Sequence, residues 1–361
     1  MNKKINVAFT ARDPFLVENI ISSEEKEIRG QEYIQYGDRN IYPQYLYNLY
    51  LHCPTLQSAI NSVVDYTLGE KVYSKLDKIN DKDTIEDLIR YITLDYVIYG
   101  GFALNILRNR LGGIAQIHHL DFKNVRSNKD NTEIFYSPDW SNKSYGRIKA
   151  IKYPTYKKDS KDASSVLYYT NTHIQTYPIP MWGAAVLGAE MEARINNFQL
   201  NSIINGFSAS YIINLNNGVP SDEVKEEIER NFNEKFCGNE NSGRLVIAYN
   251  DNKDNACSIE AIPEDKIVEK YDTAVKRAKE QIMTAFRCNP AILGIQVDGN
   301  GFNDNDTKES FRLFSKVVIR PIQNTILRAL NDLLENADIS IEPFEIDFSD
   351  EGENNNEIVK D

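Results

Sequence analysis

Two long helical patterns separated by a break constrain the fold of this 361-residue chain more than any other stretch. The first pattern runs from about Glu264 to Arg287, and its apolar residues recur at steps of three or four, on one face of a helix. At 1.5 Å per residue this helix is roughly 36 Å long. The second pattern begins at Asp306, which has the spacing of a capping box with Glu309, and Pro321 is expected to kink it.

The break between the two rods, residues 288–306, contains no lysine or arginine. Its proline and three glycines exclude a continuous helix, so the segment is predicted to be a flexible loop. Its aspartates and asparagines resemble the start of a calcium loop, but the calcium motif begun at Asp298 fails at Phe302 and Asn303. No metal is therefore expected at this loop.

The overall charge argues against one broad class of function. The chain carries 41 basic and 53 acidic residues, a net charge of −12. Tight DNA binding depends on lysine and arginine contacts to phosphates, so a tight DNA-binding protein is not expected. The four cysteines form no CxxC pair, which indicates neither a zinc site nor a disulfide framework. No apolar run could span a bilayer and none makes a signal peptide, so we expect a soluble intracellular or particle-bound protein without a membrane segment.

Tyrosine-rich helices dominate the beginning of the chain. Tyrosines are frequent in residues 31–69, but lysine and arginine are not interleaved with them as in a base-stacking platform, so a place in the core or at an interface is expected. Gly69 is predicted to end one helix. Asp83 is predicted to cap the next helix, which Gly100-Gly101 should end.

Five β-rich runs follow these helices. They are Phe102–Asn109, Ile114–Leu120, Phe122–Arg126, Ile148–Tyr156 and Val166–Tyr169. The first two flank a Gly-Gly turn and predict a hairpin, and the third is expected to join the hairpin. The first half of the chain is therefore predicted to be an α+β unit.

The second half begins after two prolines in Tyr177–Trp182. Gly183–Asn205 then predicts a helix with a thin apolar stripe, which is expected to pack beside copies of itself. An insert with a strand at 209–215, a helix capped by Ser221 and a strand at 244–249 separates this helix from the first rod. The acidic C-terminal residues have no core-forming pattern and predict a disordered tail.

A catalytic constellation is absent from the sequence. The phosphate loop GxxxxGK[ST], the metal-binding HExxH and the nucleophile turn GxSxG do not occur. His118 and His119 are adjacent on a predicted strand, so their side chains should point to opposite faces and cannot chelate one ion together. We therefore expect no catalytic site, metal or cofactor, and an intracellular enzyme of unassigned reaction stays as an alternative.

A series of segments, in order along residues 31–335, carries a family resemblance. The segments are Tyr36–Pro43, Asp95–Ala103, His119–Arg126, Tyr177–Pro180, Asn205-Gly206, Lys235–Gly243 and Ala285–Gly294. In this order, and with the succession of helix, insert, helix, loop and kinked helix, the chain resembles the portal proteins of tailed bacteriophages, in particular the shorter siphophage-type portals.

The resemblance implies a fold and an assembly. The assembly is a ring, usually a dodecamer, at one capsid vertex, through which the genome is packaged and later ejected. The fold is α+β: a wing, two stem helices flanking an α/β clip, a tunnel loop, and a long kinked helix leading to a short crown. The implied parts are an N-terminal extension (1–30), the wing (31–182), the first stem helix (183–206), the clip (207–263), the second stem helix (264–288), the tunnel loop (289–306), the kinked helix and short crown (307–346) and an acidic tail (347–361).

The resemblance also implies roles for particular residues. The residues expected to line the DNA channel are Asp298, Asn300, Phe302, Asn303, Asp304 and Asp306. Those expected to dock partners at the clip are Glu223, Glu226, Glu227 and Arg230. Those expected to pack one stem against the next are Phe198, Ile267, Tyr271, Val275 and Ile282.

The implied partners are those of a capsid vertex. They are other copies of the chain, the large terminase subunit, the head-tail adaptor, the major capsid and scaffolding proteins, and double-stranded DNA that passes without sequence-specific binding. The implied location is the virion, after assembly in the host cytoplasm. A loop with aspartates and without cations would repel phosphates and keep the duplex centred. Another ring-forming connector of the virion, or a portal-like scaffold in a phage-derived particle, stays as the main alternative.

Overall fold

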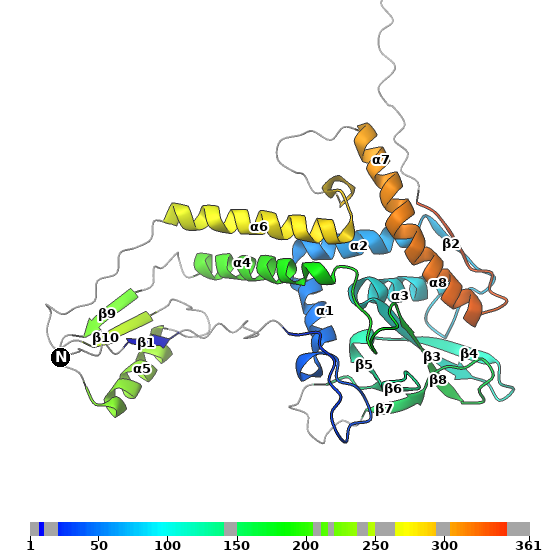
Figure 1. Cartoon of the computed structure of the whole chain (residues 1–361), viewed down its shortest axis with the longest axis horizontal. Coiled ribbons are helices and arrows are strands. Elements are labelled where there is room, and N and C mark those ends of the chain that lie inside the picture. Colours follow the sequence, from blue (N-terminus) through cyan, green and yellow to red (C-terminus); the bar gives the residue numbers. More distant parts are fainter. Residues whose placement is uncertain are drawn as a thin grey trace, which may run out of the picture. The chain divides into compact units, whose positions relative to one another are not determined.

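The computed structural model of the chain describes residues 7–10, 21–140, 150–204, 211–215, 220–236, 245–249, 264–293 and 304–344 (Figure 1). The chain divides into two compact units. Unit 1 combines Met1–Ile20 with Met191–Arg277, and unit 2 combines Ile21–Glu190 with Ala278–Asp361. Each unit contains helices and strands, which confirms the predicted α+β class. Among the described helices, none has an apolar stretch long enough to cross a bilayer.

Three helices contribute much of the core of unit 2. They are α1 (Tyr42–His52), α2 (Pro54–Leu68) and α3 (Ile85–Tyr99). α1 and α2 each carry a proline in the first turn, where its missing N–H costs no helical hydrogen bond. Gly69, at φ 66°, ends α2 as predicted. Tyr36, Tyr42 and Tyr45 are buried, which confirms their expected place in the core.

α3 begins with a different cap from the predicted one. Thr84 is the N-cap: its hydroxyl accepts a hydrogen bond from the N–H of Asp87 (3.1 Å), and the Asp87 carboxylate accepts one from the N–H of Thr84 (3.0 Å). Asp83 instead accepts a hydrogen bond from the side-chain amide of Asn80 (2.9 Å). The reciprocal pair satisfies two N–H groups where Asp83 could satisfy one, so the prediction of Asp83 as the cap was wrong.

Two three-stranded antiparallel sheets occur in the described part of unit 2. Their orders are β4-β3-β8 and β5-β6-β7. The strands are β3 (Gly101–Arg108), β4 (Ile114–Leu120), β5 (Val125–Ser127), β6 (Glu133–Tyr136), β7 (Ile151–Pro154) and β8 (Ser164–Thr170). The predicted hairpin is confirmed, with Ala103 of β3 opposite Leu120 of β4.

The run Phe122–Arg126 does not join the hairpin, contrary to the prediction. Its first residues form a 3-10 turn, η2 (Phe122–Asn124), and β5 then pairs with β6 in the other sheet. The N–H of Phe122 donates to the carboxylate of Asp95 (3.2 Å), and the Phe122 ring is fully buried. Because Asp95 of α3 bonds the backbone of the turn and the core buries its Phe122 ring, the chain leaves the first sheet at this point.

The second rod starts two residues earlier than predicted. It consists of α7 (Asp304–Phe314), the π-helical turn η7 (Ser315–Ile319) and α8 (Arg320–Leu333), which follow one another without a gap (Figure 1). Asp306 therefore lies inside the first turn of α7 and is not its cap. The N–H of Arg320 donates to the carbonyl of Ser315, five residues back, which is the π-helical bond. The π turn thus ends two residues before Pro321, at which the sequence predicts a kink.

Shorter elements connect these parts of unit 2. Strand β11 (Ser340–Glu342) returns from the rod and pairs antiparallel with β2 (Lys71–Tyr73), which follows α2. Three further 3-10 turns lie in the described connecting segments: η1 (Asp38–Asn40), η4 (Gly183–Ala185) and η6 (Pro290–Leu293).

Unit 1 contains a three-stranded mixed sheet of order β1-β10-β9. The strands are β1 (Val7–Thr10), β9 (Tyr211–Leu215) and β10 (Leu245–Tyr249). Since β9 and β10 are parallel, the chain must cross over between them, and α5 (Asp222–Phe236) supplies the crossover helix. The predicted insert of strand, helix and strand is confirmed. The N-terminal segment adds β1, antiparallel to β10.

Two helices have residues in both units. They are α4 (Val186–Ile204) and α6 (Glu264–Phe286), within two or three residues of their predicted bounds. In unit 2 some of their apolar side chains are buried, as at Ala189, Ala278 and Ile282, whereas Leu187 of α4 is 58% exposed. In unit 1 apolar side chains of α4 reach the surface, and Phe198 and Leu200 are 47% and 55% exposed. Ala193 and Ile195 are nevertheless buried, so buried and exposed apolar residues occur in both parts of α4.

Candidate functional site

The residues predicted to line a channel lie mostly outside the described chain. Asp298, Asn300, Phe302 and Asn303 fall in the segment between Leu293 and α7 that the structure does not describe. Asp304 and Asp306 lie in the first turn of α7, and their side chains are outside the description. Carboxylates in this position are favoured by the partial positive charge of the helix N-terminus.

The predicted docking residues share one exposed helix. Glu223, Glu226, Glu227 and Arg230 are all exposed on α5 of unit 1. At the start of this helix the Lys225 ammonium lies 2.8 Å from the Asp222 carboxylate, which lowers the pKa of Asp222. The described part of the helix therefore presents a mainly acidic surface.

The predicted stem residues fall into two groups. In unit 1 the rings of Phe198 and Tyr271 are 5.2 Å apart, and both residues retain exposed surface, as does Val275. Ile282 is fully buried in unit 2, inside its own chain. Ile267 is described only by its place in α6. The structure thus brings Phe198 and Tyr271 together.

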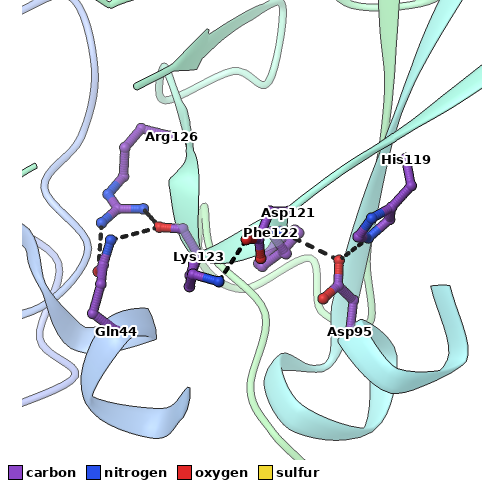
Figure 2. Close-up of polar contacts among 7 residues, drawn as sticks. All are labelled: Gln44, Asp95, His119, Asp121, Phe122, Lys123 and Arg126. Carbon is purple, nitrogen blue, oxygen red and sulfur yellow. Dashed lines mark hydrogen bonds and ion pairs between the residues drawn. The ribbon is translucent and has the colours of Figure 1, made fainter. Parts of the chain in front are cut away.

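A polar hub in unit 2 joins four of the segments that carry the family resemblance. The hub comprises Tyr36, Asn40, Asp95, His119, Arg126 and Tyr177. No role was predicted for these six residues, although they lie in segments that carry the family resemblance. Figure 2 shows part of the hub, in which α1, α3, β4 and η2 each contribute a polar contact.

Arg126 is a fully buried cation with neutral partners. Its Nε and one Nη donate to the side-chain and backbone oxygens of Asn40, both at 2.6 Å. Its other donors reach the carbonyl of Lys123 (2.9 Å) and the amide oxygen of Gln44 (3.2 Å) (Figure 2). They also reach the carbonyl of Val125 (2.7 Å). Burial lowers the pKa of Arg126 to about 10, so the guanidinium stays charged at neutral pH. One side chain therefore ties η1, α1 and η2 together.

The backbone at Asn40 is shaped for this contact. Asn40 has φ 60°, in the left-handed region, which asparagine tolerates better than most residues. Its side-chain oxygen also accepts a hydrogen bond from the N–H of Tyr36 (2.9 Å). The Tyr36 ring stacks on Tyr177 at 4.0 Å between centroids, and its hydroxyl donates to the carbonyl of Pro178 (2.9 Å). The start of unit 2 is thereby fixed to the segment just before α4.

Asp95 and His119 form the second polar centre of the hub. Oδ2 of Asp95 lies 2.7 Å from Nε2 of His119 and accepts the Phe122 N–H (Figure 2). Burial raises the pKa of Asp95. Burial lowers the pKa of His119, but the attraction of Asp95 outweighs it, so the net shift is upward. The pair joins α3 to β4.

The hub lacks the remaining parts of a catalytic site. Among the described residues, no serine, threonine or cysteine side chain forms a hydrogen bond with His119, which a nucleophile and base require. His118 faces elsewhere and bonds to Gln116 (3.0 Å), as expected for adjacent strand residues. The described chain holds no group of three metal-ligating side chains. The contacts shown for Asp95 and His119 join a helix, a strand and a turn.

Gly100 allows a close backbone approach near the hub. It ends α3 in the left-handed region, at φ 89°. A Cβ atom built at Gly100 would lie 2.4 Å from the carbonyl oxygen of Ile179. The side-chain amide of Asn171 donates a hydrogen bond to the same carbonyl oxygen (2.7 Å). Only glycine therefore fits between α3 and the segment at Ile179.

A pocket of about 280 Å³ opens between β8 and α8. Leu167 and Tyr169 of β8 line one side, and Ala329 and Leu333 of α8 line the other. Arg328 and Asp332 add two charges to the pocket. None of the pocket residues belongs to the hub.

Comparisons with known proteins identify a family. A model of the family described as "Phage portal protein" matches residues 65–352. None of the curated proteins matches the chain.

Solved structures add similarities at low sequence identity. The chain is similar to a protein in the neck of an empty gene transfer agent (GTA) particle computed with C6 symmetry (14% identity, TM-score 0.54, 85% of each chain covered). It is similar to one in the neck of a native GTA particle computed with C12 symmetry (16% identity, TM-score 0.53, 83% of this chain and 84% of the other). It also matches an HK97-family phage portal protein from Corynebacterium diphtheriae (13% identity, TM-score 0.41, 78% and 87% covered). The two GTA neck proteins share the fold of this chain.

Proposed function

The chain belongs to the phage portal protein family, and from this membership we propose that copies of it form the ring through which a tailed phage or phage-derived particle packages and ejects its genome. The family match over residues 65–352 is the observation that carries the proposal. A fold shared with neck proteins of particles computed with C6 and C12 symmetry supports a ring, and a dodecamer is the proposed form.

The parts of the chain are assigned as follows. The wing is 31–182, the stem helices are 183–206 and 264–288, the clip is 207–263, the tunnel loop is 289–306, and the kinked helix and short crown are 307–346. The division into two units supports this assignment, because unit 1 holds the β9-α5-β10 crossover and unit 2 holds the polar hub. β1 joins the N-terminal extension to the β10-β9 sheet of the clip.

Neighbouring copies pack through the exposed face of the stem. Phe198 and Tyr271 form an aromatic pair with surface remaining on both rings, and Val275 lies one helical turn beyond Tyr271. In a ring with head-to-tail contacts this face meets a different face of the next copy. Ile267 belongs to the same proposed surface, whereas Ile282 supports the stem from inside the chain.

The clip helix α5 docks the packaging motor and later the adaptor. Its exposed Glu223, Glu226, Glu227 and Arg230 give a charged surface without a large apolar patch. Such a surface suits partners that bind in succession, because charged contacts steer association without the permanence of a large apolar interface. The proposed partners are the large terminase subunit and the head-tail adaptor.

The tunnel loop approaches the DNA without binding it. Asp298, Asp304 and Asp306, with the polar Asn300 and Asn303 and with Phe302, stand in a segment free of lysine and arginine. Affinity for duplex DNA grows with the number of neutralised phosphates, so an anionic loop lets DNA move in both directions.

The proposed setting is the capsid vertex of the virion. The ring contacts the major capsid and scaffolding proteins while it assembles in the host cytoplasm. Another ring-forming virion connector is the second candidate, and the GTA neck similarities favour it over an enzyme.

Native mass spectrometry with negative-stain microscopy tests the proposal. We expect a closed ring with a central hole. A stable monomer at micromolar concentration would overturn the ring. A ring that neither binds terminase nor supports packaging would favour the other connector.

A further inference from the structure

Exposed residues recur at every fourth position along the second rod. In an α-helix, positions four apart drift around the axis by about 40° per step. The π turn η7 offsets this drift, because each residue of a π-helix turns the chain by less. The outward face therefore stays in line from α7 into α8. The exposed cations along the rod are Arg312, Lys316 and Arg320, which this geometry keeps in line, and Arg328, two α-helical steps beyond Arg320; the four are here called the basic stripe.

The basic stripe has no anionic partner among the described residues. None of its four side chains takes part in an ion pair or side-chain hydrogen bond with the described chain. From Arg312 to Arg328 it covers 328 − 312 = 16 residue steps, or about 24 Å of helix. Leu313 and Val317 lie beside the cations and are 63% and 42% exposed. A row of cations beside apolar side chains fits an acidic segment with apolar residues.

The described chain ends next to the start of this stripe. After β11 the chain reaches Phe344, whose ring centroid lies 6.3 Å from that of Phe311 and 5.4 Å from that of Tyr66. Phe311 immediately precedes Arg312, the first cation of the stripe. The residues after Phe344 therefore begin beside one end of the stripe.

The following segment has the matching charge and length. Residues 345–361 contain seven acidic residues and one lysine, a net charge of 1 − 7 = −6. Five of the acidic residues occur within nine positions: Glu345, Asp347, Asp350, Glu351 and Glu353. Nine extended residues span about 30 Å, which is enough to follow a stripe of about 24 Å. Ile346 and Phe348 supply apolar side chains between these acidic residues.

We propose that residues 345–353 lie along the basic stripe of the same chain. The carboxylates face the four cations, and Ile346 and Phe348 cover Leu313 and Val317. Because the segment is tethered at Phe344, its effective concentration at the stripe is high even though each exposed ion pair is weak. The segment thereby covers cations that would otherwise attract the phosphates of DNA.

Carbodiimide cross-linking of the full chain tests the contact directly. This reagent joins an amine to a carboxylate without a spacer, and Lys316 is the one amine of the stripe. We expect mass spectrometry to find Lys316 joined to acidic residues of 345–353. The yield should fall about tenfold between roughly 0.05 and 0.5 M salt, as screening shortens the range of the attraction. Equal yields at the exposed Lys157 and Lys161 would overturn the proposal, since they would indicate non-specific collisions.

A matched pair of full-length variants tests the covering role. The first carries E345Q, D347N, D350N, E351Q and E353Q, and the second adds R312Q, K316Q, R320Q and R328Q. We expect the first to bind duplex DNA about tenfold more tightly than the natural chain, since five screening charges are gone. The second should return to the natural affinity. If the first variant binds DNA no more tightly than the natural chain does, the proposal is wrong.

An isotope experiment identifies the chain that supplies the segment. Unlabelled and ¹⁵N-labelled chains are mixed before assembly and then cross-linked. We expect the Lys316 products to carry a single isotope. Products with both isotopes would show that a second copy supplies the segment, and would overturn the same-chain contact. The measurement applies to monomers and rings separately, so failure of the ring and failure of this contact are distinguishable.

Discussion

Nε2 of His119 on β4 lies 2.7 Å from Oδ2 of Asp95 on α3, and the same oxygen accepts the N–H of Phe122. One carboxylate thus fixes a strand, a helix and the 3-10 turn at which the chain leaves the first sheet. The pair lies within the polar hub, through which segments distant in the sequence are joined.

The Asp95–His119 pair predicts a pH dependence. The pKa of His119 is raised above its ordinary value of 6.5, so its contribution to the free energy of unfolding is complete below that pH and is lost as pH rises through the folded value. The raised pKa of Asp95 acts in the same direction from its ordinary value of 3.8 upward. Urea unfolding should therefore show His119→Gln losing more stability at pH of about 6 than at about 8.5. His118→Gln is the control, and a loss that grows with pH would contradict the pairing.

Replacing Arg126 should destabilise unit 2 strongly. Arg126→Met leaves the buried oxygens of Asn40 and two backbone carbonyls without their donors, and we expect a loss of about 3–5 kcal/mol. Arg126→Lys keeps the charge but lacks the planar set of five donors, so it should not restore full stability. Urea unfolding of both variants provides the measurement, and a loss under about 1 kcal/mol for the methionine variant would refute the role of Arg126.

Gly100 and Gly112 offer a matched test of close approach. They have nearly the same φ, 89° and 87°, but a Cβ at Gly100 meets the Ile179 carbonyl at 2.4 Å whereas one at Gly112 meets nothing within 4 Å. Each alanine variant carries a backbone strain of about 1 kcal/mol, and the clash should cost Gly100→Ala at least about 2 kcal/mol more. Equal melting temperatures for the two variants would show that the segment at Ile179 can move away from the added Cβ without loss of stability.

Reversing the charge of the tunnel loop should slow packaging. Replacing Asp298, Asp304 and Asp306 together by lysine adds three cations to the loop that we propose repels phosphate, and each new contact should strengthen DNA binding in a salt-dependent manner. We expect sub-micromolar DNA binding in a gel shift and at least about a tenfold loss of packaged genomes. Asparagine at the same three positions is the control, and normal packaging by the lysine variant would contradict the non-adhesive loop.

A charge on the stem should prevent ring closure. Phe198→Glu places a carboxylate at the aromatic pair with Tyr271, and burying it against a neighbour would cost several kcal/mol. Native mass spectrometry should therefore show smaller species with an unchanged circular dichroism spectrum. Ile174→Glu, at a position 94% exposed in unit 2, is the control and should still form rings.

Local patterns predicted most of the elements. The apolar spacing of α6, the closing glycine of α2 and the Gly-Gly turn between β3 and β4 each determine their structure over a few residues, and all three predictions are confirmed. The errors arose where two local options competed. Asp83 and Thr84 can both cap α3, and the reciprocal bond with Asp87 decided between them.

Long-range pairing decided the remaining features. The run at Phe122 has the composition of a strand, but Asp95, 27 residues away, holds its backbone in a turn. The partners of Arg126 are likewise scattered, because Asn40 is 86 residues from it in the sequence. Burial makes such contacts strong, and burial is a property of the assembled core that spacing along the chain does not reveal.

The second rod shows both kinds of information. The sequence by itself predicted two helical patterns, an anionic break and a kink at Pro321, since these depend on residue types a few positions apart. Only the tertiary structure revealed the π turn before Pro321, which keeps Arg312, Lys316 and Arg320 on one exposed face. The pairing of β11 with β2 then carries Phe344 to the start of that face. The physical reason is that helical periodicity is local, whereas the register of a rod against its neighbours is set by packing.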